Sequence, residues 1–286
     1  MPSAMNFNAR VLDKHPEFLE QTQRALFYGD ALFETIRVFD GKTPLLTRHW
    51  GRLSAGLRSL GFEIPSGWST SYFEKEILRI SPKNARVRLT VWRSPGGKYA
   101  PVDNTPQFLI TAEAMSEAQL MWPKNGLELG LCQSVLLPVD AFSNLKTLNA
   151  PRYVAASREA QANHWDDALL LNAHGRVCEA TSSNVFWWEG DLLCTVPLSE
   201  GCVAGVFRAF VLETASGLGI QIVEKAATPE TLLAAAEIFL TNAVRGIVPV
   251  RIFAGQSRPS TQTSRLFSQL EHALFNQQST ANSQPR

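Results

Sequence analysis

The first clearly patterned segment of the chain, residues 31–40, alternates apolar and polar residues. Alternation with a period of two is typical of a strand with one buried face, and the glycine directly after it favours a turn. The next segment changes period, because Leu53, Leu57 and Leu60 recur at the spacing of one helix face. We expect a helix there, with Thr47 as its N-cap and the glycine after Leu60 as its end.

The remaining chain mixes the same two periods. Short runs rich in β-branched and aromatic residues predict strands, and longer segments with helical spacing predict helices. Strands are expected at 85–93, 107–113, 127–138, 168–172, 185–190, 192–196 and 237–243, and helices at 69–81, 151–163, 204–219 and 264–277. Because strands and helices do not alternate strictly, the predicted fold class is α+β, or mixed α/β.

Two segments break the pattern. Residues 94–106 are rich in Pro and Gly and predict a loop between two strands. Periodicity is also lost near residues 115–126, where we expect an interdomain linker at 118–125. The predicted organisation is a small N-terminal α/β domain, 1–117, and a larger C-terminal domain, 126–286.

Composition narrows the class of protein. The 286 residues are 45% hydrophobic and carry 27 basic against 26 acidic side chains, a net charge of +1. This balance argues against nucleic acid or acidic membranes as partners. With no run of 18 apolar residues and no apolar leader core at the N-terminus, we expect a cytoplasmic protein without membrane spans. The four cysteines form no C-x-x-C pair and have no matching histidine cluster, so neither a metal site nor a disulfide framework is expected.

Familiar phosphate-binding and hydrolase motifs do not fit. The segment SPGGKYA lacks the glycine spacing of a P-loop, and SGLGI lies at the end of a predicted helix rather than at its start. Neither G-x-S-x-G nor H-E-x-x-H is present. The chemistry must come from another arrangement.

Three ordered segments suggest that arrangement: RALFYGDALFETIRV (24–38), SNLKTLN (143–149) and CEATSSNVFWW (178–188). Together they resemble the class IV, or fold type IV, pyridoxal-phosphate (PLP) enzymes. That family includes branched-chain aminotransferases, D-amino-acid aminotransferases and 4-amino-4-deoxychorismate lyases. The resemblance runs from about residue 24 to about 250 and implies a two-domain enzyme with PLP as cofactor.

The resemblance implies two central residues. Lys146 matches the family's Schiff-base lysine, which needs a neutral amine; burial and nearby positive charge lower a lysine pKa toward that state. Glu179 matches the glutamate that pairs with the pyridine nitrogen and keeps it protonated. A solvated surface lysine and an exposed loop glutamate are the alternatives.

The resemblance implies that the phosphate of PLP is bound by an arginine side chain and by the N-terminus of a helix. Arg52 matches the family's phosphate arginine, with Arg48 one turn away as a competitor. Where several relatives place threonines, this chain has Phe207 and Ala243, so backbone N–H groups must contribute at the helix start. The further cofactor-side residues that the resemblance implies are Ser183, Asn184, Val206, Phe207, Asn242 and Ala243.

Substrate contacts are expected on the first half of the chain. The resemblance implies Tyr28, Phe33 and Arg37 as substrate-side positions, and alternation puts Phe33 and Arg37 on one face of the strand. Arg93, beside the Gly-rich loop, is a second candidate for binding a substrate carboxylate. For Arg37 the alternative is a salt bridge with a neighbouring acid.

The expected reaction is the lyase reaction, which converts 4-amino-4-deoxychorismate to 4-aminobenzoate and pyruvate. Asn242 fits that branch, and Pro151 stands where branched-chain enzymes carry a tyrosine. The alternatives are an aminotransferase for branched-chain or D-amino acids and a non-catalytic PLP-binding protein. The expected substrate is a small amino compound with a carboxylate, and the resemblance implies a homodimer. Whether loop 94–106 closes over the site stays open.

Overall fold

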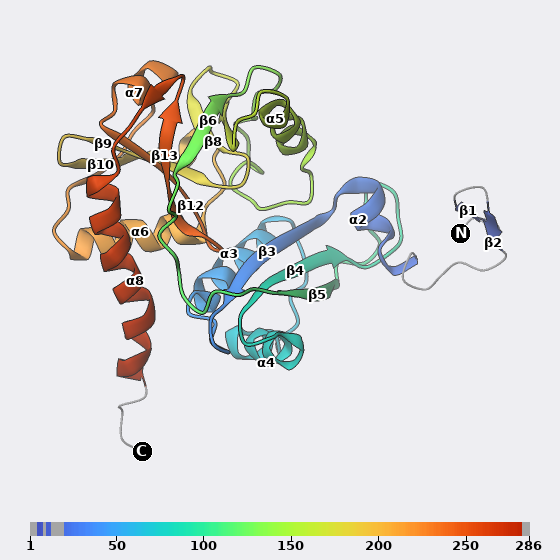
Figure 1. Ribbon diagram of the computed structural model, residues 1–286. Helices are drawn as coiled ribbons and strands as arrows, with labels where there is room; N and C mark the ends of the chain where they lie inside the picture. The colour runs from blue at the N-terminus through green and yellow to red at the C-terminus, as the bar shows by residue number, and fades with distance from the viewer. Residues whose placement is uncertain (1–4, 8–9, 13–19, 282–286) are drawn as a thin grey trace.

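The computed structural model describes residues 5–7, 10–12 and 20–281 (Figure 1). Most of the N-terminal segment on which the leader expectation depends therefore lies outside the described residues. The described chain forms a small three-stranded sheet, a large sheet and a short hairpin of β1 (Met5–Phe7) and β2 (Arg10–Leu12). No helix in this part of the chain combines the length and apolar character needed to cross a membrane.

The small sheet comes from the first half of the chain. It is antiparallel, in the order β3 (Ala31–Val38), β4 (Ala85–Arg93) and β5 (Pro106–Ala114). Helices α3 (Leu46–Ser59) and α4 (Thr70–Ile80) lie beside it (Figure 1). The short helix α2 (Gln23–Tyr28) precedes β3 and extends away from the rest of the molecule.

Alternation along β3 divides the two faces of this sheet. Leu32 and Ile36 are buried in one cluster with Leu53 of α3. Phe33 and Thr35 lie on the opposite face, which lines a cavity toward the second half of the chain. The small sheet therefore has a helix-covered apolar face and a face that is free to build a site.

The second half of the chain forms the large sheet. Its strand order is β11-β10-β9-β12-β13-β6-β7-β8, with β14 paired to β13. The β13–β6, β6–β7 and β10–β11 pairs are parallel and the other pairs antiparallel. The bounds are β6 Leu127–Leu131, β7 Asp167–Leu171, β8 Val177–Ala180, β9 Asn184–Glu189, β10 Leu192–Thr195, β11 Ile222–Glu224, β12 Glu237–Asn242, β13 Gly246–Phe253 and β14 Gln256–Ser257.

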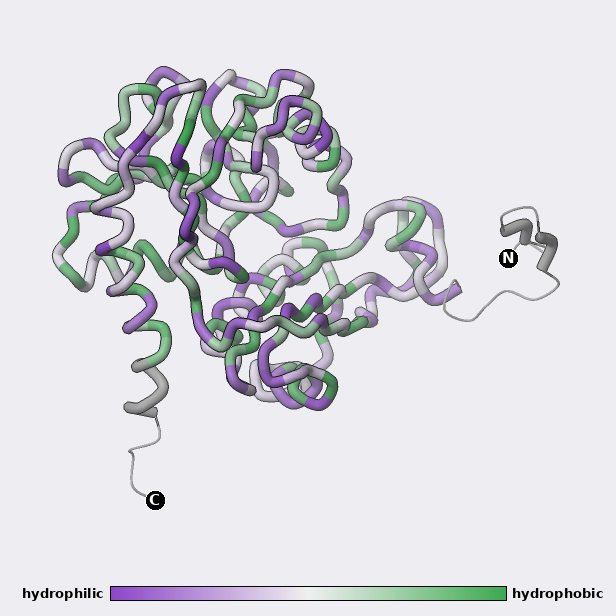
Figure 2. Tube along the Cα trace, in the orientation of Figure 1, coloured by the Kyte–Doolittle hydropathy of each residue, from purple (hydrophilic) through white to green (hydrophobic). Residues whose placement is uncertain are grey.

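Both faces of the large sheet are covered, which explains the unbroken apolar run of β9. Val185 and Trp187 point into one cluster, and Phe186 and Trp188 into another. A strand that is buried on both faces needs no polar alternation. Figure 2 shows hydrophobic stretches in both halves of the molecule, in agreement with separate cores. The helices of this half are α5 (Pro151–Ala162), α6 (Val206–Gly217), α7 (Pro229–Ala234) and α8 (Thr261–Ala281), with a 3₁₀ turn at Leu198–Glu200.

The mixed α/β class and most predicted elements are confirmed. Several boundaries differ by a few residues, as for the final helix, which was expected at 264–277 and spans Thr261–Ala281. Two differences have a local structural reason. The first long helix begins at Leu46, with Leu45 as an N-cap that has no side-chain bond, so Thr47 lies inside its first turn. The strand expected over 127–138 ends at Leu131, because the chain turns where the backbone N–H groups of residues 133 and 134 donate to the carboxylate of Glu159.

The expected linker at 118–125 lies between β5 and β6 and contains no helix or strand. The small sheet uses only residues before it and the large sheet only residues after it. The division into two domains at this segment stays a prediction.

Gly130 of β6 offers a test of the packing in the second half. A Cβ added there would lie 1.7 Å from a ring carbon of Trp165, whereas a Cβ at Gly51 of α3 meets nothing within 4 Å. Overpacking by one methyl group typically lowers the free energy of unfolding by about 1–3 kcal/mol. We expect at least that loss for Gly130→Ala and a gain of about 0.5–1 kcal/mol for the helical control Gly51→Ala, measured by denaturant unfolding. Equal stability of the two variants would contradict this packing.

Candidate active site

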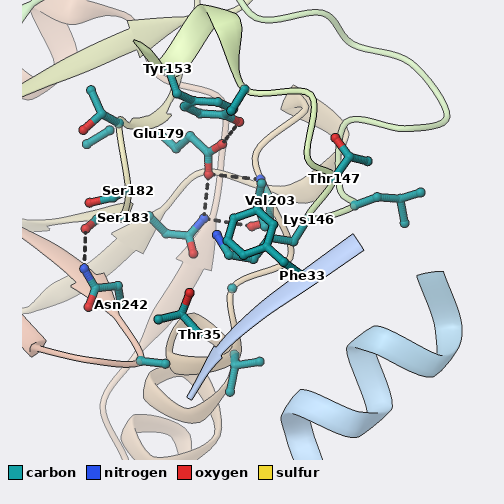
Figure 3. Close-up of a pocket in the computed structure, with 18 of the residues that line it drawn as sticks. Phe33, Thr35, Lys146, Thr147, Tyr153, Glu179, Ser182, Ser183, Val203 and Asn242 are labelled. Atoms are coloured by element: carbon teal, nitrogen blue, oxygen red, sulfur yellow. Dashed lines mark hydrogen bonds between the residues drawn. The ribbon is translucent and has the colours of Figure 1, made fainter. Parts of the chain in front are cut away.

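A cavity of about 630 Å³ lies between the free face of the small sheet and the large sheet. Its walls come from β3, the segment before α5, the β8–β9 turn, the start of α6 and the end of β12 (Figure 3). Ten of the residues expected at the site line it: Phe33, Arg52, Lys146, Glu179, Ser183, Asn184, Val206, Phe207, Asn242 and Ala243.

Lys146 reaches the cavity through a short pairing between the two halves. The backbone N–H of Phe33 donates to the Lys146 carbonyl at 3.0 Å, and the N–H of Leu148 donates to the Ala31 carbonyl at 3.1 Å. The Lys146 Nζ lies 4.5 Å from the centre of the Phe33 ring. Burial, with the nearby charge of Arg52, lowers the pKa of Lys146. The structure therefore favours the neutral amine that nucleophilic chemistry requires.

Glu179, on β8, is 3% exposed. Three groups donate to its carboxylate: the Tyr153 hydroxyl to Oε1 at 2.6 Å, and the Val203 N–H (3.0 Å) and Asn184 Nδ2 (3.3 Å) to Oε2. Burial raises the pKa of Glu179 to about 7, while the Tyr153 bond, the Lys146 charge and the Val203 bond oppose that rise. The carboxyl group is poised between its two protonation states near neutral pH.

Asn184 connects Glu179 to the start of α6. Its Nδ2 also donates to the Val203 carbonyl at 2.9 Å. A Cβ at Gly205, the N-cap of α6, would lie 1.8 Å from the Asn184 Oδ1. Only glycine permits this approach, so Gly205 is fixed by the geometry of the site.

Arg52 lies between α3 and the start of α6. Its Nη1 donates to the Ala204 carbonyl at 3.0 Å, and its Nε and Nη2 bind Glu34. Glu34 also accepts a bond from the buried His49 at 2.6 Å. Burial would raise the pKa of Glu34, but the Arg52 charge and the bonds from His49 and Arg52 lower it to about 2. Arg48, the competitor, pairs with Glu213 outside the cavity.

Anion-binding groups gather at one end of the cavity. Helix α6 begins at Val206, and the N–H groups of a first helical turn have no partners within the helix. Nearby, Asn242 Nδ2 donates to the Ser183 hydroxyl at 3.1 Å. The Thr241 hydroxyl is buried and has no partner within the described residues. Such an orphaned donor fits a bound anion.

Tyr28 and Arg37, both expected at the substrate side, do not line the cavity. Tyr28 is 40% exposed on α2, with its ring 5.5 Å from that of Tyr99. Arg37 lies on the same face of β3 as Phe33, but its guanidinium donates to the Glu117 carbonyl at 2.5 Å. It therefore contacts the connection between the sheets.

Arg93 also lies away from the cavity. Its Nε donates to Asp30 at 2.9 Å, its Nη1 to Asn104 at 2.6 Å and its Nη2 to the Leu60 carbonyl at 2.7 Å. These bonds hold the base of the 94–106 loop. The geometry of a single chain gives no support for a substrate contact by Tyr28, Arg37 or Arg93.

Sequence reasoning missed several residues that the cavity contains. Tyr153 lies seven residues after Lys146, in the first turn of α5, and only the position five residues after the lysine was considered. Arg88 of β4 lies opposite Thr35 in the register of the small sheet. Strand alternation would have placed Arg88 on the cavity face only if the pairing of β3 with β4 had been known. Among the described residues, no group of three or more His, Cys, Asp or Glu side chains could hold a metal ion.

The family model for class IV aminotransferases matches residues 31–253 of the chain. The chain belongs to the class IV aminotransferase family. A putative branched-chain-amino-acid aminotransferase of Methanocaldococcus jannaschii is 29% identical, over 92% of each chain. The structure of 4-amino-4-deoxychorismate lyase from Pseudomonas aeruginosa is 31% identical, with a TM-score of 0.76, over 86% of this chain and 92% of that one.

A third relative bears on the cofactor. An aminotransferase from Brucella abortus, determined with bound PLP, is 25% identical, with a TM-score of 0.77, over 93% of this chain and 98% of that one. At the level of the family, the expectation of an enzyme that uses PLP is confirmed, and so is the expected fold type.

The raised pKa of Glu179 predicts a pH effect on the protein without added PLP. The folded chain holds this proton up to about pH 7, whereas the unfolded chain loses it near 4.5. The free energy of unfolding of the wild type should therefore fall, relative to that of Glu179→Gln, by about 2 kcal/mol as the pH rises from 5 to 7.

Denaturant unfolding at several pH values measures this difference. His49, whose pKa burial lowers, titrates in both proteins, so its contribution cancels in the comparison. Parallel stability curves for the wild type and Glu179→Gln between pH 5 and 7 would contradict a raised pKa.

Proposed function

We propose that this chain binds PLP in the cavity and uses it to split 4-amino-4-deoxychorismate into 4-aminobenzoate and pyruvate. Lys146 would hold the cofactor covalently, Glu179 would pair with its ring nitrogen, and the first turn of α6 with Arg52 would bind its phosphate. The orphaned Thr241 hydroxyl and the N–H groups of the first turn of α6 support a phosphate at that end.

When bound, PLP supplies an aldehyde and a protonated ring that withdraws electrons from the carbon bearing the substrate amine. Glu179, as a carboxylate, would stabilise the protonated ring nitrogen. Once the substrate amine has replaced Lys146 on the aldehyde, the freed Lys146 amine would take the proton from that carbon, while the C–O bond to the enolpyruvyl group breaks and the substrate ring becomes aromatic. Lys146 would then deliver the proton to the methylene carbon of the enolpyruvate, which leaves as pyruvate.

The observation that carries the lyase proposal is the positive charge of the cavity wall. Arg88, Arg152 and Arg245 line the cavity, and within the described residues none of them forms a salt bridge. The Arg88 guanidinium lies 3.9 Å from the centre of the Phe33 ring, near the Lys146 amine. A substrate with two carboxylates matches such a wall, and the likeness to the Pseudomonas lyase agrees with it.

An aminotransferase is the second candidate. The Methanocaldococcus relative, named as a putative branched-chain aminotransferase, matches this chain at 29% identity over 92% of both lengths. An aminotransferase would use Lys146 and Glu179 in the same way but would place the proton on the cofactor. The two reactions differ in whether a second substrate is needed.

The covalent role of Lys146 can be tested by borohydride reduction of the PLP-loaded protein, followed by peptide mapping. We expect the label on Lys146 alone, because burial lowers the pKa of its amine and so favours the neutral, nucleophilic form. Lys146→Ala should unfold like the wild type but incorporate no label. A label on Lys98 or Lys124 would refute the assignment.

Product analysis separates the lyase from the aminotransferase. With aminodeoxychorismate as the sole substrate, we expect stoichiometric pyruvate and 4-aminobenzoate over many turnovers. Glu179→Gln should slow the reaction at least tenfold, since an amide cannot balance the protonated ring nitrogen. Turnover of D-alanine or L-leucine that stops after one equivalent and resumes when 2-oxoglutarate is added would instead establish the aminotransferase.

We also propose that the protein is a homodimer. Leu26 and Phe27 of α2 are each 65% exposed, and Tyr99 and Val102 of the neighbouring loop are 89% and 77% exposed. Arg24 joins these two segments by donating to the Gly96 and Lys98 carbonyls. An exposed apolar patch of this kind favours a protein interface, and two-fold dimers are the commonest oligomers.

Sedimentation velocity at micromolar concentration tests the dimer. We expect a dimer for the wild type and a monomer near 32 kDa for Phe27→Glu, because a charge in the patch would lose its water on association. The control Leu218→Glu changes a leucine that is 46% exposed at the end of α6 and should leave the dimer intact. A monomeric wild type would exclude the proposal.

A further inference from the structure

Tyr153 is a cavity residue to which the preceding assignments give no role. It lies in the first turn of α5, which begins at Pro151, and its ring packs against the apolar cluster of the large sheet. Figure 3 shows its hydroxyl directed at Glu179, on the side of the carboxylate away from Val203. Burial and the adjacent Glu179 raise the pKa of Tyr153, so the phenol stays protonated and can only donate to that carboxylate.

The two oxygens of the Glu179 carboxylate accept different numbers of hydrogen bonds. Each carboxylate oxygen accepts about two hydrogen bonds. Oε2 already accepts from Val203 and Asn184, whereas Oε1 accepts from Tyr153 alone. Among the described residues, one acceptor position on Oε1 is therefore left, and the Tyr153 bond decides how that oxygen is turned.

We propose that Tyr153 is a positioning residue, whose hydroxyl holds the Glu179 carboxylate in the charged form and in the orientation that leaves one acceptor for the ring nitrogen of PLP. The proposal rests on the proposed function, since it concerns the same cofactor. Without the phenol, a carboxylate that is 3% exposed would lose one of three donors and favour its neutral form. A neutral carboxyl group pairs poorly with a protonated ring nitrogen.

Other charged and titratable groups face Glu179 from the surrounding elements. Lys146 and Arg52 lower the pKa of Glu179, and the thiols of Cys178 and Cys202 are close enough for Glu179 to raise their pKa values. All four remain in Tyr153→Phe, which removes only one oxygen. A change in that variant therefore reports on the hydroxyl.

A double-mutant cycle on PLP affinity tests the proposal without measuring turnover. The dissociation constant of PLP is measured by absorbance titration of the cofactor-free protein for the wild type, Tyr153→Phe, Glu179→Gln and the double variant. We expect Tyr153→Phe to weaken binding about tenfold, the effect of one hydrogen bond to a charged acceptor. In the Glu179→Gln background the same change should weaken binding less than twofold.

Tyr72→Phe is the matched control. Tyr72 packs edge-on against Phe73 in the small sheet's core and does not line the cavity, so we expect no change in PLP affinity. The pH at which PLP affinity is half-maximal should also move upward in Tyr153→Phe but not in Tyr72→Phe, because only Tyr153 holds Glu179 charged.

Three other outcomes of the double-mutant cycle would contradict the role of Tyr153 or the proposed function. An equal loss of affinity in both backgrounds would overturn the proposal, because Tyr153 would then act on the fold or on PLP directly. No loss in either background would overturn it as well. If the wild type itself fails to bind PLP, the proposed function falls along with the inference, whereas tight binding with an unresponsive Tyr153 refutes the inference alone.

Discussion

Glu179 is a carboxylate almost entirely removed from water, and burying such a charge without partners costs several kcal/mol. The surrounding structure reduces that cost with donors from three different segments: Tyr153 in α5, Asn184 at the start of β9 and the Val203 backbone before α6. Even so, the pKa of Glu179 is raised to about 7. The donors within the protein therefore do not fully stabilise the negative charge of Glu179. A cationic ring nitrogen of PLP would supply the stabilisation that is missing.

The site also depends on contacts between the two halves of the chain. Lys146 belongs to the second half but is positioned by hydrogen bonds to β3, in the first. Arg52 belongs to the first half and bonds to Ala204 at the start of α6. Because each contact joins a site residue to an element far away in sequence, movement between the sheets would change the distance from Lys146 to Glu179. The cavity therefore requires both halves to be folded and packed together.

Sequence reasoning was strongest where chemistry and local pattern coincide. Phe33, Lys146 and Glu179 followed from the family resemblance of short motifs, and all three line one cavity. The period-two pattern of β3 added only that Phe33 and Arg37 share a face of the strand, and Arg37 does not line the cavity. Arg93 shows the limit, since only tertiary structure reveals that Asp30 and its neighbours occupy its guanidinium. Tyr153 was missed because its contact with Glu179 joins residues 26 apart, and no local periodicity encodes such a contact.

A crystal structure of the protein with PLP tests the central claim most directly. The account predicts continuous density from the Lys146 Nζ to the cofactor, the ring nitrogen in contact with Glu179 Oε1, and the phosphate against the first turn of α6. Glu179 should keep its bonds to Tyr153 and Val203 in that structure. PLP attached to another lysine, or a ring nitrogen that faces away from Glu179, would contradict it.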